Sequence, residues 1–193
     1  MNFPHSPHCH ACQQRVYELL HAIYGACSAN KQFPWPARPE DYANAAIGNI
    51  LEQIRIALGD LRGHRDFIRS AQMPPCDYFT SDPPFIVEFD ENQHFSQPRL
   101  TTLSNYSGNS PIGFSKSRWQ ELCRQLDARD DQPFDRDERR AWYDTLRDLL
   151  PTMHGFKPTV RLYAKEVEWC AFTVTETGIA QFRAQLSDRL PGK

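Results

Sequence analysis

Four residues that are able to bind a metal ion or move a proton fall within one short stretch of the chain. They are Asp77, Glu88, Asp90 and His94. Clustered carboxylates repel one another unless a cation lies between them, and hard divalent ions such as Mg²⁺ and Mn²⁺ prefer oxygen ligands. Imidazole titrates near neutral pH and is suited to proton transfer. If the fold gathers these side chains, we expect a metal-dependent site for phosphodiester cleavage. Asp77 and Glu88 would bind one ion, Asp90 a second ion or the attacking water, and His94 would be the general acid or base.

The residues around this set predict a β-hairpin. The apolar run over residues 85–89 is typical of a buried strand, and residues 76–80 predict its partner across a tight Ser-Asp-Pro-Pro turn. Because side chains alternate between the faces of a strand, Glu88 and Asp90 point the same way, and Asp77 reaches the same place from the neighbouring strand. The alternative is a hairpin end whose acids are merely solvated.

The same stretch resembles a known nuclease signature. Glu88-Phe-Asp90-Glu-Asn-Gln-His94 is similar to the Glu-x-Asp-Gly-x-Gln-His motif of small nucleases related to the very-short-patch repair endonucleases, in the PD-(D/E)xK restriction-endonuclease-like superfamily. The resemblance implies a small mixed sheet with helices on both faces, and an Mg²⁺-dependent endonuclease acting on DNA in repair or defence. Further matches follow in the family's order, over roughly half of the chain: Asp77-Tyr-Phe, Asp137-Glu-Arg-Arg140, Val160-Arg-Leu-Tyr163 and Glu166-Val167.

Two positions depart from the family pattern. Glu91 replaces the glycine that follows the second acid, and Asp90 stands where the superfamily usually has a lysine, two residues after Glu88. The resembling subfamily tolerates this substitution, but the charge-stabilising role is left unassigned. Lys165, after a strand predicted at 159–163, is one candidate. A nuclease-like fold that binds nucleic acid or a partner protein without cutting is therefore a second hypothesis.

Phosphate contacts would have to come from local basic patches, because the formal net charge is −2. A helix predicted over residues 61–70 carries one patch, and a long polar loop predicted over 96–114 begins beside His94. Arginines at the start of another predicted helix oppose its dipole and therefore need acidic partners or phosphates. The candidate nucleic-acid contacts are Arg62, Arg65, Arg99, Arg139 and Arg140.

Cys9 and Cys12 have the Cys-x-x-Cys spacing of half a zinc site. The six cysteines of the chain are more typical of thiols or metal ligands than of disulfides, because the sequence has no signal-peptide pattern. A structural Zn²⁺ supporting an interaction module, with the hairpin only structural, is a third hypothesis. Two ordinary thiols at a helix start are the simpler alternative. The candidate further ligands are His5, His8, His10, Cys27 and Cys76.

Length and composition favour one soluble domain over residues 1–193, with 40% hydrophobic and 24% charged residues. Residues 1–70 are predicted to be mainly helical, 71–175 to form the core with the strands, and 176–193 to form a C-terminal helix. The class is α/β, a small mixed sheet flanked by helices. No apolar run approaches about 18 residues, so we expect a cytoplasmic protein without a membrane segment. Self-association or a protein partner remains open beside nucleic acid.

Overall fold

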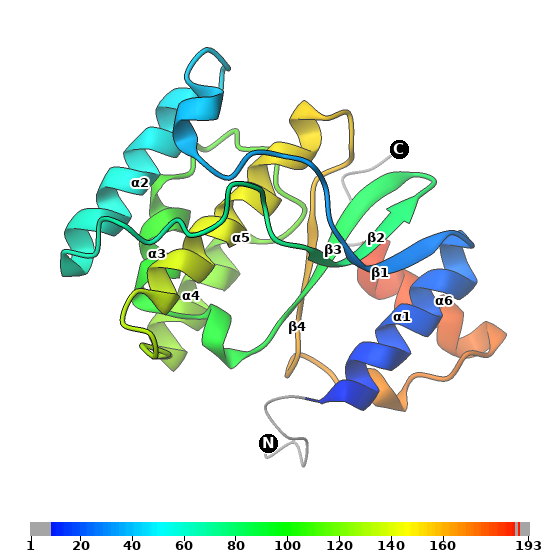
Figure 1. Cartoon of the computed structure of the whole chain (residues 1–193). Helices are drawn as coiled ribbons and strands as arrows, with labels where there is room; N and C mark the ends of the chain where they lie inside the picture. The colour runs from blue at the N-terminus through cyan, green and yellow to red at the C-terminus, as the bar shows by residue number, and fades with distance from the viewer. Residues whose placement is uncertain (1–8, 188, 190–193) are drawn as a thin grey trace.

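A four-stranded mixed sheet forms the centre of the computed structural model, which describes residues 9–187 and residue 189 (Figure 1). The strands lie in the order β1-β2-β3-β4; β2 is antiparallel to both β1 and β3, and β4 is parallel to β3. This confirms the predicted α/β class. The strands are β1 (Cys27–Lys31), β2 (Cys76–Ser81), β3 (Pro84–Asp90) and β4 (Val160–Tyr163).

Helices cover both faces of this sheet (Figure 1). One face carries α1 (His10–Tyr24) and α6 (Glu176–Ser187), and the other faces α2 (Gly48–Arg62), α3 (Gln97–Asn105), α4 (Lys116–Leu126) and α5 (Arg136–Met153). Each side has its own hydrophobic core. The described part of the chain also contains three short 3-10 helices: η1 (Pro39–Tyr42), η2 (Asn92–His94) and η3 (Trp169–Ala171).

Alternation along β3 divides its side chains between the two cores, as the sequence predicts. Phe85, Val87 and Phe89 pack into the core under α1 and α6, whereas Ile86 belongs to the core of the other helices. Glu88 lies opposite Arg161 of β4 in the register, and both are buried. The hairpin therefore delivers its acidic residues to the side of the sheet that α5 covers.

Three predicted elements are wrong. The helix predicted over residues 61–70 does not form, because α2 ends at Arg62 and Gly63 adopts a left-handed φ of 79° that suits a glycine after a helix. The long loop predicted over 96–114 contains α3, whose Ser96 cap accepts a hydrogen bond from the Arg99 amide. The segment predicted as a loop from residue 28 contains most of β1.

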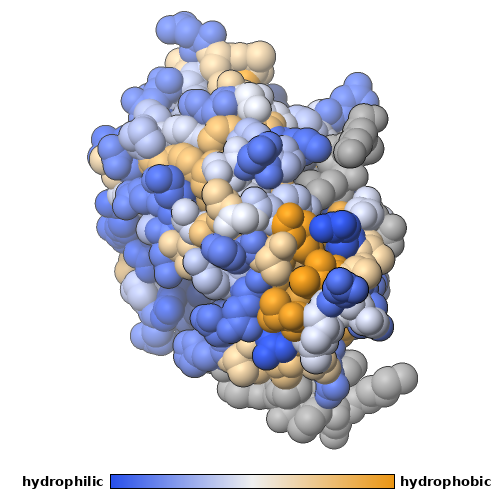
Figure 2. Space-filling model, turned by 90° about the vertical axis from the view of Figure 1, so that its right-hand side faces the viewer, coloured by the Kyte–Doolittle hydropathy of each residue, from blue (hydrophilic) through white to orange (hydrophobic). Residues whose placement is uncertain are grey.

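The surface where α1 and α6 lie shows one group of hydrophobic side chains among hydrophilic ones (Figure 2). Ile23, Phe172 and Ile179 are among the partly buried apolar residues that pack against the core under α1 and α6. Within the described part of the chain, none of the helices combines the length and hydrophobicity needed to span a bilayer.

Candidate functional site

A pocket of about 310 Å³ opens between the β2–β3 hairpin and α5. Acidic residues from both strands, a histidine and a row of arginines line it. It gathers three of the four residues that the sequence marks for chemistry, because Asp77, Glu88 and His94 all reach it. The other lining residues are Pro74, Arg136, Arg139, Arg140, Tyr143 and Arg147.

Backbone hydrogen bonds hold the two acids of the hairpin side by side. The Asp77 amide donates to Glu88 Oε1 at 3.2 Å, and the Phe89 amide donates to Asp77 Oδ2 at 2.7 Å. Glu88 is only 2% exposed. Burial, opposed by Arg147 and reinforced by Asp77, raises the pKa of Glu88 to about 8, and burial also raises the pKa of Asp77. Negative charge on these two carboxyl groups is therefore unfavourable in the metal-free protein, and a bound cation would stabilise it.

This burial predicts a pH dependence of the metal-free protein. Glu88 keeps its proton up to about pH 8 when folded but loses it near its ordinary pKa of 4.5 when unfolded. The folded state binds more protons between these values, so the free energy of unfolding falls as the pH rises through the window. Glu88 contributes up to about 1.4 kcal/mol per pH unit there. Urea unfolding at several pH values in chelator should show this slope, and Glu88→Gln should reduce it. Equal slopes for the two proteins would contradict the assignment.

His94 is oriented by Asp144 of α5. Its Nδ1 lies 2.9 Å from Asp144 Oδ2 and 3.5 Å from Asp90 Oδ1. Burial disfavours the charged ring, but Asp144 outweighs it and raises the pKa of His94. Against the same cost of burial, His94 and Arg161 hold the pKa of Asp144 well below its usual range. Asp144 thus fixes a largely buried imidazole at the edge of the pocket.

Asp90 lies in a buried network and does not line the pocket. Its Oδ1 accepts from Arg161 Nη1 at 2.6 Å and its Oδ2 from Trp119 Nε1 at 2.7 Å, and it is fully buried. Both carboxylate oxygens of Asp90 therefore accept hydrogen bonds from protein groups. Neither is available for the predicted contact with a metal ion or a water molecule in the pocket. Asp148 joins Arg161 to Arg99 in the same network, at 2.7 and 2.6 Å.

The predicted phosphate contacts separate into two groups. Arg139 and Arg140 line the pocket, and Arg140 also pairs with acidic neighbours. Arg99 is 1% exposed and bonded to Asp148, so the predicted phosphate contact is contradicted by its burial. Arg62 pairs with Glu138, Arg65 pairs with Asp60, and neither lines this pocket.

Arg147 is the functional candidate that sequence reasoning missed. Its Nε lies 3.5 Å from Glu88 Oε1, and its Nη1 lies 3.4 Å from Asp144 Oδ1. Arg136, Arg140 and Arg147 recur along α5 at spacings of four and seven residues, which place side chains on one helix face. That spacing was visible in the sequence, but only tertiary packing shows that this face meets Glu88. Lys165, by contrast, is exposed after β4.

A second hollow, of about 390 Å³, adjoins Asp77 on the α1 side. Asp77 lines both hollows, so the surface is recessed on either side of this carboxylate. Its wall is formed by residues of α1 and of the first two strands, most of them polar or aromatic: His10, Gln13, Gln14, Tyr17, Ala29, Asn30 and Tyr78. A polymer crossing Asp77 would therefore meet arginines on one side, and amides and aromatic rings on the other.

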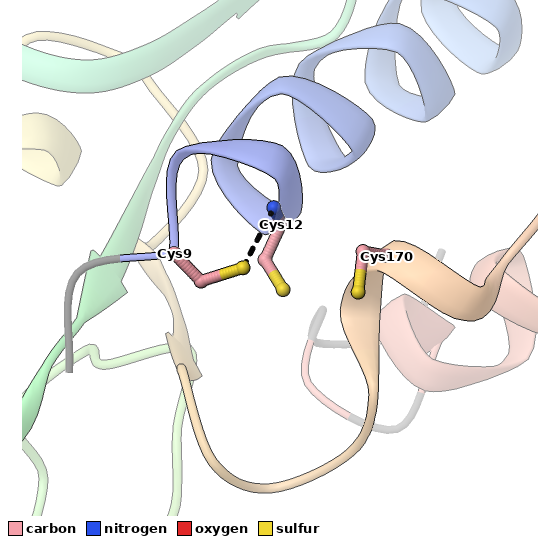
Figure 3. A group of neighbouring side chains, drawn as sticks. All are labelled: Cys9, Cys12 and Cys170. Carbon is pink, nitrogen blue, oxygen red and sulfur yellow. Dashed lines mark hydrogen bonds between the residues drawn. The ribbon is translucent and has the colours of Figure 1, made fainter. Parts of the chain in front are cut away.

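The sulfur atoms of Cys9, Cys12 and Cys170 lie within 4.8 Å of one another, so this cluster could hold a metal ion (Figure 3). The sequence predicts the first two, but Cys170 was not among the expected further ligands. Cys76 bonds to the Lys31 carbonyl in the other core, and Cys27 lies on β1, past the far end of α1. His10 is exposed and outside the cluster, while His5 and His8 lie outside the described residues.

No family model, curated protein or solved structure matches this chain.

Proposed function

We propose that this protein is a metal-dependent nuclease with a restriction-endonuclease-like core, and that it cleaves phosphodiester bonds of DNA. One observation carries the proposal. Asp77 and Glu88 are held side by side in a pocket that His94 and the arginines of α5 also line. Carboxylates paired for a cation, next to cations suited to phosphates, match the needs of phosphodiester hydrolysis.

The residues present fit Mg²⁺ or Mn²⁺. Asp77 and Glu88 supply hard oxygen ligands, and burial, reinforced by the charge of Asp77, raises the pKa of Glu88 in the metal-free state. The Phe89 carbonyl is a suitable third ligand. A residue within a strand directs its N–H and its C=O toward the same neighbouring strand, and the Phe89 N–H already donates to Asp77 of β2. When bound, the ion would lower the pKa of a water ligand and stabilise negative charge on the phosphate.

Arg147 would take the charge-stabilising role that the resembling superfamily usually gives to a lysine, because Asp90 occupies that position here. Its side chain is mostly buried, it faces Glu88, and its Nε–H has no hydrogen-bond acceptor among the residues that the structure describes. A phosphate oxygen entering the pocket would satisfy this donor. Arginine suits the task because its guanidinium remains charged and binds phosphate through a planar set of donors.

His94 would transfer the proton. Asp144 holds its Nδ1, which leaves Nε2 as the ring nitrogen for a substrate oxygen or the attacking water. Asp144 would act as a positioning residue, since it fixes the ring and favours its protonated form. A protonated His94 is suited to protonate the leaving oxygen.

DNA is the proposed substrate because the hairpin resembles that of repair-type nucleases and because several arginines line the pocket beside it. The hollow on the α1 side would receive the nucleotide beside the cleaved bond. A cytoplasmic place in repair or defence follows from this proposal.

The test is cleavage of supercoiled plasmid and of labelled single strands with Mg²⁺, with Mn²⁺ and with chelator. Cutting that requires either ion supports the proposal. A folded protein that cuts none of these substrates with either ion would overturn it.

Arg139→Ala is expected to weaken DNA binding by about tenfold and to reduce the salt dependence of binding by about one phosphate contact. Arg139 lines the pocket, and no ion pair of its side chain is among the described contacts. Fluorescence anisotropy with labelled duplex and single strands at several salt concentrations measures both effects. Arg124→Ala, on the exposed face of α4, is the matched control and should bind as wild type does. Equal losses of affinity in the two variants would show that Arg139 does not contact DNA in this pocket.

A binding protein that no longer cuts is a second candidate, favoured by one contact. Arg147 already partners Glu88 at 3.5 Å and supplies a positive charge where a metal would bind. In that case DNA would bind equally well in Mg²⁺ and in chelator, without cleavage. The cysteine cluster favours the third hypothesis, a zinc-stabilised interaction module. The cluster shares no residue with the acidic pocket, so a zinc site is compatible with either of the first two candidates.

A further inference from the structure

We propose that Cys9, Cys12 and Cys170 form a structural Zn²⁺ site that fastens the start of α1 to the segment that follows β4. The proposal does not depend on the nuclease proposal, because none of these residues lines the acidic pocket. It adds a third ligand, far away in the sequence, to the Cys-x-x-Cys pair.

The geometry of the three thiols carries the inference. All three sulfur atoms lie within 4.8 Å of one another, and they point toward one place between α1 and η3 (Figure 3). Sulfur atoms bound to zinc at about 2.3 Å in a tetrahedron lie about 3.8 Å apart, so a small contraction would seat the ion. Cys9 caps α1, and its Sγ accepts from the Cys12 amide at 3.3 Å. The first turn of α1 thereby fixes two ligands before a metal arrives.

The chemical environment favours a soft cation. All three side chains of the cluster offer sulfur atoms, which are the ligands that soft cations prefer. Zinc binds thiolates and displaces their protons, whereas Mg²⁺ and Mn²⁺ prefer oxygen. The fourth position of the tetrahedron is left to water or to a further donor.

The position of the cluster indicates what the ion would do. η3 contains the fully buried Trp169, which packs with the apolar residues of α1 and α6. Joining Cys12 to Cys170 closes a long chain segment that contains all four strands of the sheet, and closing a long loop restricts the unfolded chain. Zinc would therefore stabilise the α1 side of the fold, including the hollow beside Asp77.

Zinc content of the purified full-length protein tests the proposal. We expect about one zinc per chain in wild type and in Cys27→Ser, a half-buried cysteine outside the cluster, and at least a tenfold lower content in Cys170→Ser. Chelator should lower the melting temperature of wild type but not of Cys170→Ser. Glu88→Gln should retain the zinc, which separates this site from the acidic pocket.

A second measurement keeps the proposal testable if Cys170→Ser does not fold. Wild type loaded with Co²⁺ should show the intense near-ultraviolet absorption of thiolate-to-cobalt charge transfer, and zinc should abolish it. A chain that holds no zinc and binds no cobalt through sulfur would overturn the proposal. So would a disulfide between two of these cysteines in freshly purified protein, or a zinc content that Cys170→Ser leaves unchanged.

Discussion

Glu88→Gln is expected to abolish metal-dependent cleavage while the protein remains folded. Glutamine keeps the size of the side chain and can still accept the hydrogen bond from the Asp77 amide. It removes the negative charge that would hold the ion. We expect a loss of about a thousandfold or more in the cleavage rate, on the scale of removing a principal electrostatic group from an active site.

The fold should tolerate this substitution for a specific reason. Burial already favours the neutral form of Glu88, with a pKa of about 8, so a neutral amide replaces a side chain that is largely protonated in the metal-free protein at neutral pH. Thermal unfolding in chelator should therefore show little loss of stability. Loss of activity together with loss of the fold would not support a role in metal binding.

Glu121→Gln makes the same chemical change on the exposed surface of α4, where Glu121 pairs with Arg124. This control should cut as fast as wild type. Plasmid cleavage by the three proteins, purified in parallel and assayed over a range of Mn²⁺ concentrations, gives the comparison. A contaminating nuclease would give equal rates in all three, and equal rates would remove Glu88 from the site.

The acidic half of the pocket follows from the sequence because its geometry is local. Apolar residues on both sides of a Pro-Pro turn predict the hairpin, and alternation then fixes the side of the sheet that Glu88 faces. The register that sets Asp77 opposite Glu88 spans only a few residues. Such short-range rules do not depend on where the helices pack.

The basic half depends on tertiary packing and was only partly predicted. Arg139 and Arg140 were singled out because they oppose a helix dipole, but nothing local indicates that the α5 face bearing Arg147 lies against Glu88. The same limit explains Cys170, which reaches Cys12 only when α1 packs beside η3. The sequence of α3 is polar and has no strong apolar stripe, and its capping Ser96 is a residue equally typical of loops, so local patterning does not predict this helix.

Asp90 shows that a residue can match a catalytic motif in the sequence and yet have a structural role in the folded protein. Its spacing from Glu88 places it on the correct face of β3, as the sequence predicts. The parallel neighbour β4, however, sets Arg161 beside it, and the guanidinium binds Asp90 and Asp148 together. A buried charge needs such partners. Asp90 thereby helps to join β3 and β4 to α5.

Arg161→Met is expected to cause the largest loss of stability of any single substitution considered for this protein. Arg161 is fully buried, 2.6 Å from Asp90 and 2.7 Å from Asp148. Methionine fills much of the volume but leaves carboxylates without their shared counter-charge. Removing one partner of a buried ion pair costs about 3–5 kcal/mol. Since domains of this kind are stable by only about 5–15 kcal/mol, a large part of the total would be lost.

Arg124→Met is the matched control, because it makes the same change where Arg124 forms an exposed pair with Glu121 on α4. Exposed pairs contribute about 0–1 kcal/mol, so this variant should unfold nearly as wild type does. Urea unfolding at neutral pH, followed by tryptophan fluorescence, measures both. If Arg161→Met is insoluble, Arg161→Lys, which keeps the charge but loses the planar donors, should show an intermediate loss. Equal stabilities for Arg161→Met and Arg124→Met would contradict a stabilising role for the buried ion pairs of Arg161.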